Sequence, residues 1–249
     1  MAFDFDGDGD YIAYGDQTPY EPSSNMSFSI WLSADSWVTN RGVFNKLGSF
    51  LGGIDGYSIY ATAGAGGVFV VNMADATASA VYYVSSLLWA TATWTHIFAV
   101  YDSSLGVGAR WALWRNGVAE TLLVNAEGAP TPSNSTAALD IGRRPPSEPT
   151  TEGWDGQIAE AAIWNVSLGA AQASQLNAKM SPLSISPNDL VFYDPLIRDP
   201  FDRINGFAGT ITGNAATFAH PPMYYPADIF SGVSGRRRGS GTLVGPGIF

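Results

Sequence analysis

An Asn-Gly pair between two apolar runs constrains the fold more than any other feature of this chain. Residues 111–115 precede Asn116-Gly117, and residues 118–124, mostly apolar, follow the pair. Asn and Gly readily take the two positive φ angles of a type I′ turn, which joins neighbouring antiparallel strands. The pattern therefore predicts a β-hairpin whose second strand covers residues 118–124.

Several other segments also favour strands. Residues 27–32 alternate polar and apolar side chains, and 67–72 and 96–101 are short runs rich in β-branched and aromatic residues. The 28 glycines and 15 prolines supply turns between such segments. We expect an all-β jelly-roll sandwich of two antiparallel sheets, with an extended C-terminal arm. One short helix is expected near residues 168–178, with Ser167 as its cap.

Composition excludes several classes of function. The 12 basic and 22 acidic residues give a net charge of −10, which repels a phosphate backbone, so we expect no nucleic-acid partner. The absence of cysteine excludes disulfides, thiol catalysis and cysteine-based zinc sites. No apolar stretch approaches 18 residues, so we expect no membrane partner, and the N-terminus resembles no signal peptide.

Charge divides the chain into two parts. Residues 1–178 hold 17 acidic and 6 basic residues, whereas residues 179–249 hold 5 and 6. We expect a sandwich over residues 1–218, in which residues 181–218 are a late-joining segment whose strands complete the sandwich from its C-terminal side. Residues 219–249 are expected to form an extended arm rich in Pro, Gly and Arg.

Several segments in a fixed order resemble one known family. The similar segments are 3–12, 28–32, 94–102, the turn 116–117, 139–143 and 153–168, followed by a further echo at 189–196 and 209–213. In this order they resemble the laminin-G-like and pentraxin-like domains of the concanavalin A-like lectin/glucanase superfamily. The resemblance implies a fold rather than a function, because this superfamily includes lectins, hydrolases, adhesion modules and virion proteins.

The acidic residues do not form the pattern of a glycoside hydrolase. Such enzymes in this superfamily place carboxylates at alternate positions of one strand, on the same face of the sheet. Here Glu152, Asp155 and Glu160 are spaced by three and five residues. His96 lies within an apolar strand, where we expect a satisfied structural histidine, and His220 is remote from it in sequence. We therefore expect a non-enzymatic protein without catalytic residues.

The segment Asp6-Gly7-Asp8-Gly9-Asp10 suggests calcium, since carboxylates at alternate positions supply oxygen ligands. It departs from the EF-hand pattern, because Tyr11 takes the glycine position and Gln17 the twelfth position. We expect a polar turn without a metal or other cofactor, and calcium at Asp6, Asp8 and Asp10 is the alternative.

Two of the eight tryptophans are candidates for stacking on a sugar ring. Trp37 and Trp89 lie in polar or loop-like surroundings, whereas core packing is expected for most of the others. We therefore select Trp37 and Trp89 as possible glycan-stacking residues.

The arm carries the predicted assembly contacts. Its apolar anchors and basic triplet are Tyr224, Tyr225, Phe230, Arg236, Arg237, Arg238 and Phe249. We expect a bacteriophage virion protein (a capsid decoration, head-fibre or tail-associated protein) made in the host cytoplasm, with this arm as the anchor. Its partners would be other virion proteins, copies of itself and surface glycans. The alternative is a free carbohydrate-binding lectin module.

Overall fold

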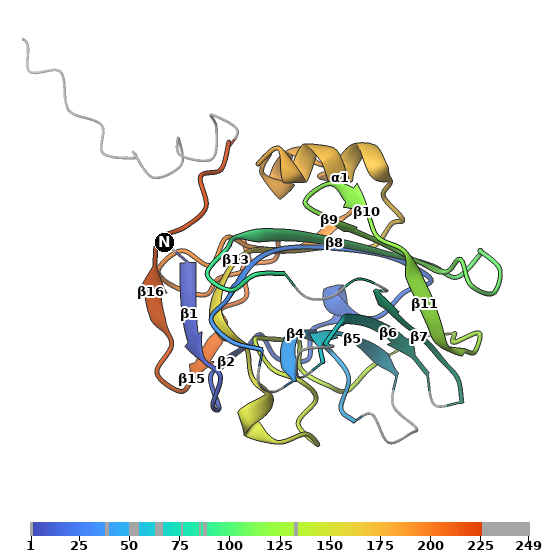
Figure 1. Cartoon of the computed structure of the whole chain (residues 1–249), viewed down its shortest axis with the longest axis horizontal. Helices are drawn as coiled ribbons and strands as arrows, with labels where there is room; N and C mark the ends of the chain where they lie inside the picture. Colours follow the sequence, from blue (N-terminus) through green and yellow to red (C-terminus); the bar gives the residue numbers. More distant parts are fainter. Residues whose placement is uncertain are drawn as a thin grey trace, which may run out of the picture.

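The chain folds into two stacked antiparallel sheets (Figure 1). The computed structural model describes residues 2–37, 40–49, 55–62, 67–75, 77–84, 86, 89–131 and 134–225. Each sheet has eight strands, which confirms the predicted all-β sandwich. Residues 226–249 of the predicted arm, which include Phe230, Arg236, Arg237, Arg238 and Phe249, lie outside the described residues.

The chain passes several times from one sheet to the other. Sheet A contains β1 (Ala2–Asp6), β3 (Asn25–Ala34), β8 (Thr95–Asp102), β9 (Trp111–Arg115), β10 (Val118–Ala119), β13 (Asp155–Trp164), β14 (Leu190–Asp194) and β16 (Ala216–Phe218). Sheet B contains β2 (Tyr11–Ala13), β4 (Arg41–Asn45), β5 (Gly56–Ala61), β6 (Phe69–Ala74), β7 (Ser79–Val84), β11 (Leu122–Glu127), β12 (Asp140–Ile141) and β15 (Thr210–Thr212). The helical elements are α1 (Ala170–Asn177) and the 3₁₀ turns η1 (Thr18–Tyr20), η2 (Thr150–Glu152) and η3 (Pro182–Ser184).

The main core lies between the sheets and is rich in aromatic residues. Phe28 of β3 contacts Tyr57 of β5 with ring centroids 4.9 Å apart, and Phe44 and Trp111 complete this contact region. All four side chains are buried. Because successive residues of a strand point to opposite faces, the apolar positions of the alternating pattern reach this core, and the intervening residues reach the outer faces.

The predicted hairpin is present, but its second strand is shorter than expected. Asn116 and Gly117 have φ angles of 51° and 76° and connect β9 to β10. The expectation that residues 118–124 form one strand is wrong. The chain leaves sheet A after Ala119, and β11 pairs with β7 in sheet B. Residues 118–124 are therefore divided between the two sheets. They resemble one strand in the sequence because β-propensity does not show where a chain changes sheets.

Strands from residues 190–218 pair with strands from earlier in the chain. Strand β14 pairs with β13, whereas β15 pairs with β2 and β16 pairs with β1. Two buried hydrogen bonds secure this arrangement: the hydroxyl of Tyr14 donates to Asp194 at 2.6 Å, and that of Tyr20 donates to Asp202 at 2.8 Å. The last strands thus complete edges that the first strands begin.

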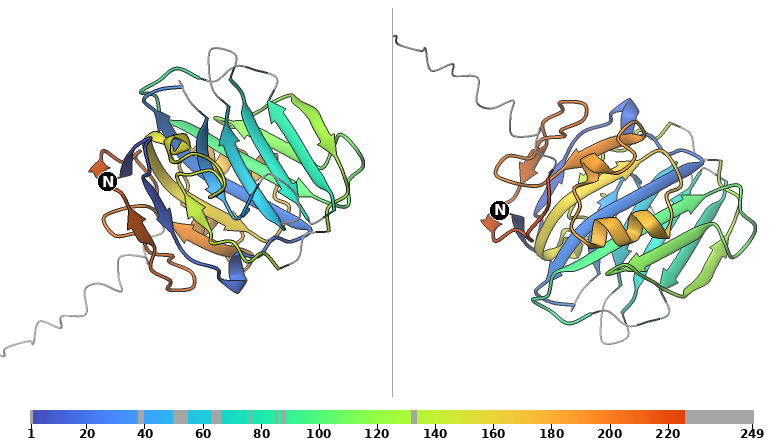
Figure 2. Two further views of the ribbon diagram at one scale, coloured as in Figure 1. Left: turned by 90° about the horizontal axis from the view of Figure 1, so that it is seen from below. Right: turned by 90° about the horizontal axis from the view of Figure 1, so that it is seen from above.

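Helix α1 covers the outer face of sheet A, as Figure 2 shows in its right-hand view. Its buried Leu176 packs in a second apolar cluster with Phe98, Trp164 and Ile185. The helix begins one residue after Gly169, whose amide donates to the side chain of Gln172. The prediction that Ser167 caps the helix is wrong, because the Ser167 hydroxyl donates to the Tyr101 carbonyl instead. No helix in the described ranges is long and apolar enough to cross a membrane.

Candidate ligand site

The two selected tryptophans lie against each other. Trp37 donates from Nε1 to the carbonyl of Trp89 at 3.0 Å, and their rings meet edge to face at 5.0 Å. Trp37 also contacts Trp154, and Trp89 contacts Phe69, so both pack against the main core. Both are half-buried. Their use in glycan stacking stays a prediction.

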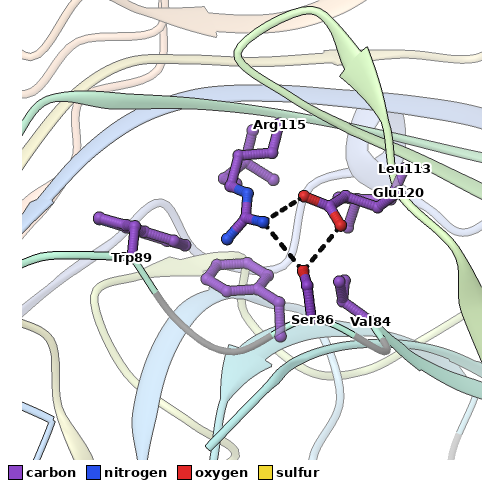
Figure 3. Close-up of a pocket in the computed structure, with 8 residues that line it drawn as sticks. Val84, Ser86, Trp89, Leu113, Arg115 and Glu120 are labelled. Carbon is purple, nitrogen blue, oxygen red and sulfur yellow. Dashed lines mark hydrogen bonds and ion pairs between the residues drawn. The ribbon is translucent and has the colours of Figure 1, made fainter.

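A small cavity adjoins Trp89 (Figure 3). Arg115 forms an ion pair with Glu120 at 2.6 Å, and the Ser86 hydroxyl bonds to both side chains. The cavity has a volume of about 10 Å³, which accommodates one water molecule at most. It is therefore too small for a sugar ring.

A larger hollow lies at the end of sheet A where β1, β13 and β16 meet. Its volume is about 360 Å³, within the size range of small-ligand sites. Five carboxylates and one amide line it: Asp4, Asp6, Asp10, Asp35, Asp155 and Asn214, with Phe5 and Ala216. We call it the acidic hollow.

Strand pairing explains why these carboxylates meet. Asp4 and Asp6 alternate with core residues of β1, so both point to the outer face of sheet A. Asp4 lies opposite Gln157 of β13, and Asp6 lies opposite Asp155. Asp35 follows β3 and continues its pairing with β13, because the Asp35 amide donates a hydrogen bond to the Asp155 carbonyl. Residues from opposite ends of the sequence thus form one wall.

Hydrogen bonds fix the side chains around the hollow. Gln157 donates from Nε2 to Asp4 at 2.6 Å and lies 3.4 Å from an oxygen of Asp35. Asp155 forms an ion pair with the buried Arg41 at 3.0 Å. Burial raises the pKa of Asp35, although the amide of Gln157 opposes this shift. The wall therefore presents fixed hydrogen-bond acceptors toward the opening.

The turn that suggested calcium forms part of this wall. Asp6 accepts a bond from the Asp8 amide, and Asp10 accepts bonds from the amides of Asp6 and Asn214. Asp10 is buried, whereas Asp8 is exposed. In the part of the chain that the structure describes, no three acidic or histidine side chains form a group that could hold a metal ion. Calcium at Asp6, Asp8 and Asp10 remains the alternative to the prediction of no cofactor.

The three carboxylates considered for glycoside hydrolysis have different hydrogen-bond and ion-pair partners. Glu152 bonds to Asn40 and Arg144, and Asp155 bonds to Arg41. Glu160 lies buried on the outer face of sheet A, where Tyr225 and His220 face it. The structure thus brings only Asp155 of these three into the acidic hollow.

The two histidines have different surroundings. His96 is fully buried, and its Nε2 lies 2.9 Å from the Ser29 hydroxyl, but Nδ1 has no partner. The expectation of a satisfied histidine is therefore only half met. Burial lowers the pKa of His96 to about 3. His220 instead faces Glu160, with Nε2 to Oε1 at 3.0 Å.

The first residues of the predicted arm lie on the sandwich. Tyr225 donates from its hydroxyl to Glu160 at 2.5 Å, and its ring packs against the α1 cluster. The Tyr224 side chain is 73% exposed. The role of these two tyrosines as assembly contacts stays a prediction.

With this geometry established, comparisons define the class of protein. The Laminin G 3 model of the concanavalin A-like lectin/glucanases superfamily matches residues 6–174. The chain belongs to this family, as the sequence resemblance indicated. No curated protein matches the chain.

Solved structures share the fold at low sequence identity. A candidate carbohydrate-binding protein from Bacteroides ovatus superimposes with a TM-score of 0.59 and 17% identity, covering 90% of this chain and 61% of that chain. The chain thus spans about three fifths of that protein. A heptameric SAP-like pentraxin from Limulus polyphemus gives 0.52 and 14%, covering 85% and 95%. The CBM40 of a Ruminococcus gnavus sialidase bound to α2,3-sialyllactose gives 0.52 and 10%, covering 71% and 96%.

Most of the acidic hollow is not apparent from the sequence. The alternation of Asp4 and Asp6 around Phe5 could have placed both carboxylates on one strand face. No local pattern connects them to Asp35 or Asn214, because pairing between distant strands brings these residues together.

Proposed function

We propose that this chain is a glycan-binding module and that the acidic hollow binds a neutral sugar. The observation that carries the proposal is a ligand-sized hollow with acceptor groups from β1, β13, the residue after β3 and the β15–β16 turn. Sugar hydroxyls donate hydrogen bonds, and bonds to carboxylates are stronger than bonds between neutral groups. The carbohydrate-binding relatives support this function by analogy of fold.

The charge of the hollow favours neutral over acidic sugars. Five carboxylates line it, and Arg41 compensates only Asp155 directly. A sialic acid would add a further carboxylate to this site, where like charges repel. We therefore expect sialyllactose, the ligand of the Ruminococcus gnavus module, to bind more weakly than uncharged oligosaccharides.

Binding to a panel of neutral and sialylated oligosaccharides, measured by isothermal titration calorimetry, tests the proposal. We expect Asp35→Asn to weaken binding by roughly tenfold, the equivalent of one hydrogen bond to a charged group. Asp8→Asn is the matched control, because Asp8 is exposed and does not line the hollow. Equal affinity of both variants, with unchanged melting temperatures, would remove the hollow from glycan binding. Recovery of cleaved oligosaccharide would contradict the non-enzymatic expectation.

An assembly role is a second candidate. It is favoured by Tyr224, which exposes most of its side chain close to where the described chain ends. The virion anchor would then be the arm 219–249, with Tyr224 among its contacts, and its basic triplet would dock on an acidic partner. A chain ending at Tyr225 should keep its fold but lose attachment to source particles in a sedimentation assay. Full attachment of that shortened chain would exclude this anchor.

A further inference from the structure

Strand β16 carries an aromatic side chain that the sandwich leaves uncovered. Phe218 is 48% exposed, and it belongs to none of the apolar clusters formed by the described residues. Tyr224 is the only other aromatic residue among them that is exposed to this degree. Single exposed apolar residues are common on protein surfaces, so the exposure of Phe218 gains meaning from what lies beside it.

Strand pairing places Phe218 on the same face of sheet A as the acidic hollow. Successive residues of a strand point to opposite faces, so Phe218 shares its face with Ala216, which lines the hollow. Phe218 lies opposite Ala2 of β1, and Ala216 lies opposite Asp4. Residues two apart in a strand are separated by about 7 Å. The Phe218 side chain is therefore attached one strand step from the wall of the hollow.

The side chains next to Phe218 on this face are small. Ala2 lies opposite it across the strand pair, and Ala216 is its neighbour along β16. A methyl group cannot cover an aromatic ring. On its other side β16 forms the edge of sheet A, with no further strand among the described residues (Figure 1). Nearly half of the Phe218 side chain thus stays open to solvent at the rim of the hollow.

Asp4 supplies an acceptor on the same side of the hollow. It lies in a row across three strands, between Gln157 of β13 and Ala216 of β16. Gln157 donates to one carboxylate oxygen of Asp4 at 2.6 Å. No second donor bonds to this carboxylate in the part of the chain that the structure describes. Asp4 therefore offers an acceptor oxygen, held in place by Gln157, next to the strand that carries Phe218.

The tryptophans selected from the sequence lie elsewhere. Trp37 and Trp89 are not among the residues that line the acidic hollow, and each packs against further aromatic rings. The family match ends at residue 174, so the segment of β15 and β16 that carries Asn214 and Phe218 lies outside it. The aromatic ring beside the hollow is therefore a feature of this chain that the family resemblance does not account for.

We propose that Phe218 is the stacking residue of the glycan site and makes the site selective for sugars in the pyranose form. The C–H face of a pyranose ring lies on the Phe218 side chain, while its hydroxyls donate to Asp4 and the other carboxylates of the hollow. One aromatic surface beside a few placed polar groups is the usual composition of a small-ligand site. The inference rests on the proposed glycan binding and adds the apolar contact and the ring form of the ligand.

Saturation-transfer NMR on the full chain tests the stacking. The probes are methyl β-D-glucopyranoside and methyl β-D-galactopyranoside, each compared with its open-chain counterpart, sorbitol or galactitol. The sugar alcohols carry at least as many hydroxyls but present no ring face, so they gain only the polar contacts. When aromatic protons are irradiated, the C–H protons on one face of the bound pyranoside should receive most of the saturation. In an NMR titration the pyranoside should bind roughly fivefold more tightly than its sugar alcohol.

Three variants separate stacking from the presence of an apolar side chain. Phe218→Leu keeps the apolar character but removes the aromatic face, so it should weaken pyranoside binding by roughly fivefold and leave the weaker binding of the sugar alcohol unchanged. Phe218→Trp restores a ring and should keep the preference for pyranosides. Tyr224→Leu is the matched control, because Tyr224 is the other exposed aromatic residue and does not line the hollow. It should bind both kinds of probe like the unmodified chain.

The outcomes keep this inference apart from the proposed function. Unchanged pyranoside binding by Phe218→Leu, while Asp35→Asn weakens it, would remove Phe218 from the site and leave the hollow as the glycan site. An equal loss of binding for pyranoside and sugar alcohol in Phe218→Leu would refute the selection of the ring form. The absence of binding to every probe and every oligosaccharide would refute the proposed function itself, and this inference with it.

Discussion

Lowering the pH from 7 to 5 should reduce the free energy of unfolding by about 2 kcal/mol through His96 alone. The side chain is fully buried against Trp31, with ring centroids 5.2 Å apart, and one ring nitrogen has no partner. Burial lowers its pKa from the ordinary value of 6.5 to about 3. In this interval the unfolded chain takes up a proton that the native chain does not bind.

The sign follows from the direction of that shift. The stabilising contribution is complete above the unfolded pKa and is lost as the pH falls toward the folded pKa of about 3. Between about pH 6 and pH 4 the loss approaches 1.4 kcal/mol per pH unit. Acidic residues also change stability in this range, so the effect of His96 must be isolated by comparison with a variant.

Urea denaturation of the unmodified chain and His96→Leu at pH 7 and pH 5 provides that comparison. The variant leaves the Ser29 hydroxyl without its partner at both pH values, so only the difference in pH dependence is informative. We expect the unmodified chain to lose about 2 kcal/mol more than the variant. Equal losses would show that His96 becomes protonated in the native state and would refute this account of its burial.

Three further predictions concern stability. Gly117→Ala should lower the free energy of unfolding by about 1–2 kcal/mol in urea denaturation, because φ is +76° and the added carbon would lie 3.1 Å from Asn177. Gly106→Ala is the control and should not change stability, because the added carbon would lie in open space. Tyr20→Phe removes a donor from buried Asp202 and should cost about 1–3 kcal/mol, measured in the same way; no loss would mean that the other donors suffice. In calorimetry, a chain ending at residue 218 should melt roughly 5–10 °C below one ending at residue 225, because buried Glu160 loses its partners Tyr225 and His220. Equal melting temperatures would show that residues 219–225 do not stabilise the sandwich.

Local chemistry explains which elements the sequence could predict. The Asn116-Gly117 turn forms because those two residues tolerate positive φ wherever they occur, and residues 27–32 alternate because β3 has one face on the core. The sheet change after Ala119 depends instead on where β7 offers a free edge. Hairpins and the buried faces of strands can thus be predicted from local sequence. The sheet that a strand joins depends instead on the assembled fold.

The candidate site is harder to read for a related reason. Gln157 joins Asp4 to Asp35 only because β13 pairs with both β1 and β3. Glu160 faces Tyr225 and His220 because of the register shift in β13, and no residue type near it marks that shift. Both features come from contacts between segments more than 60 residues apart, which a local pattern cannot encode.

The pairing of the first strands with the last ones sets the order in which the protein can mature during synthesis. Strands β1 and β2 leave the ribosome long before their outer partners β16 and β15. Until then the nascent chain presents two unpaired backbone edges, which are the usual starting points of intermolecular strand addition. Contacts between strands so far apart in the sequence also form slowly. A chain interrupted before residue 210 should therefore be prone to aggregation and depend on chaperones.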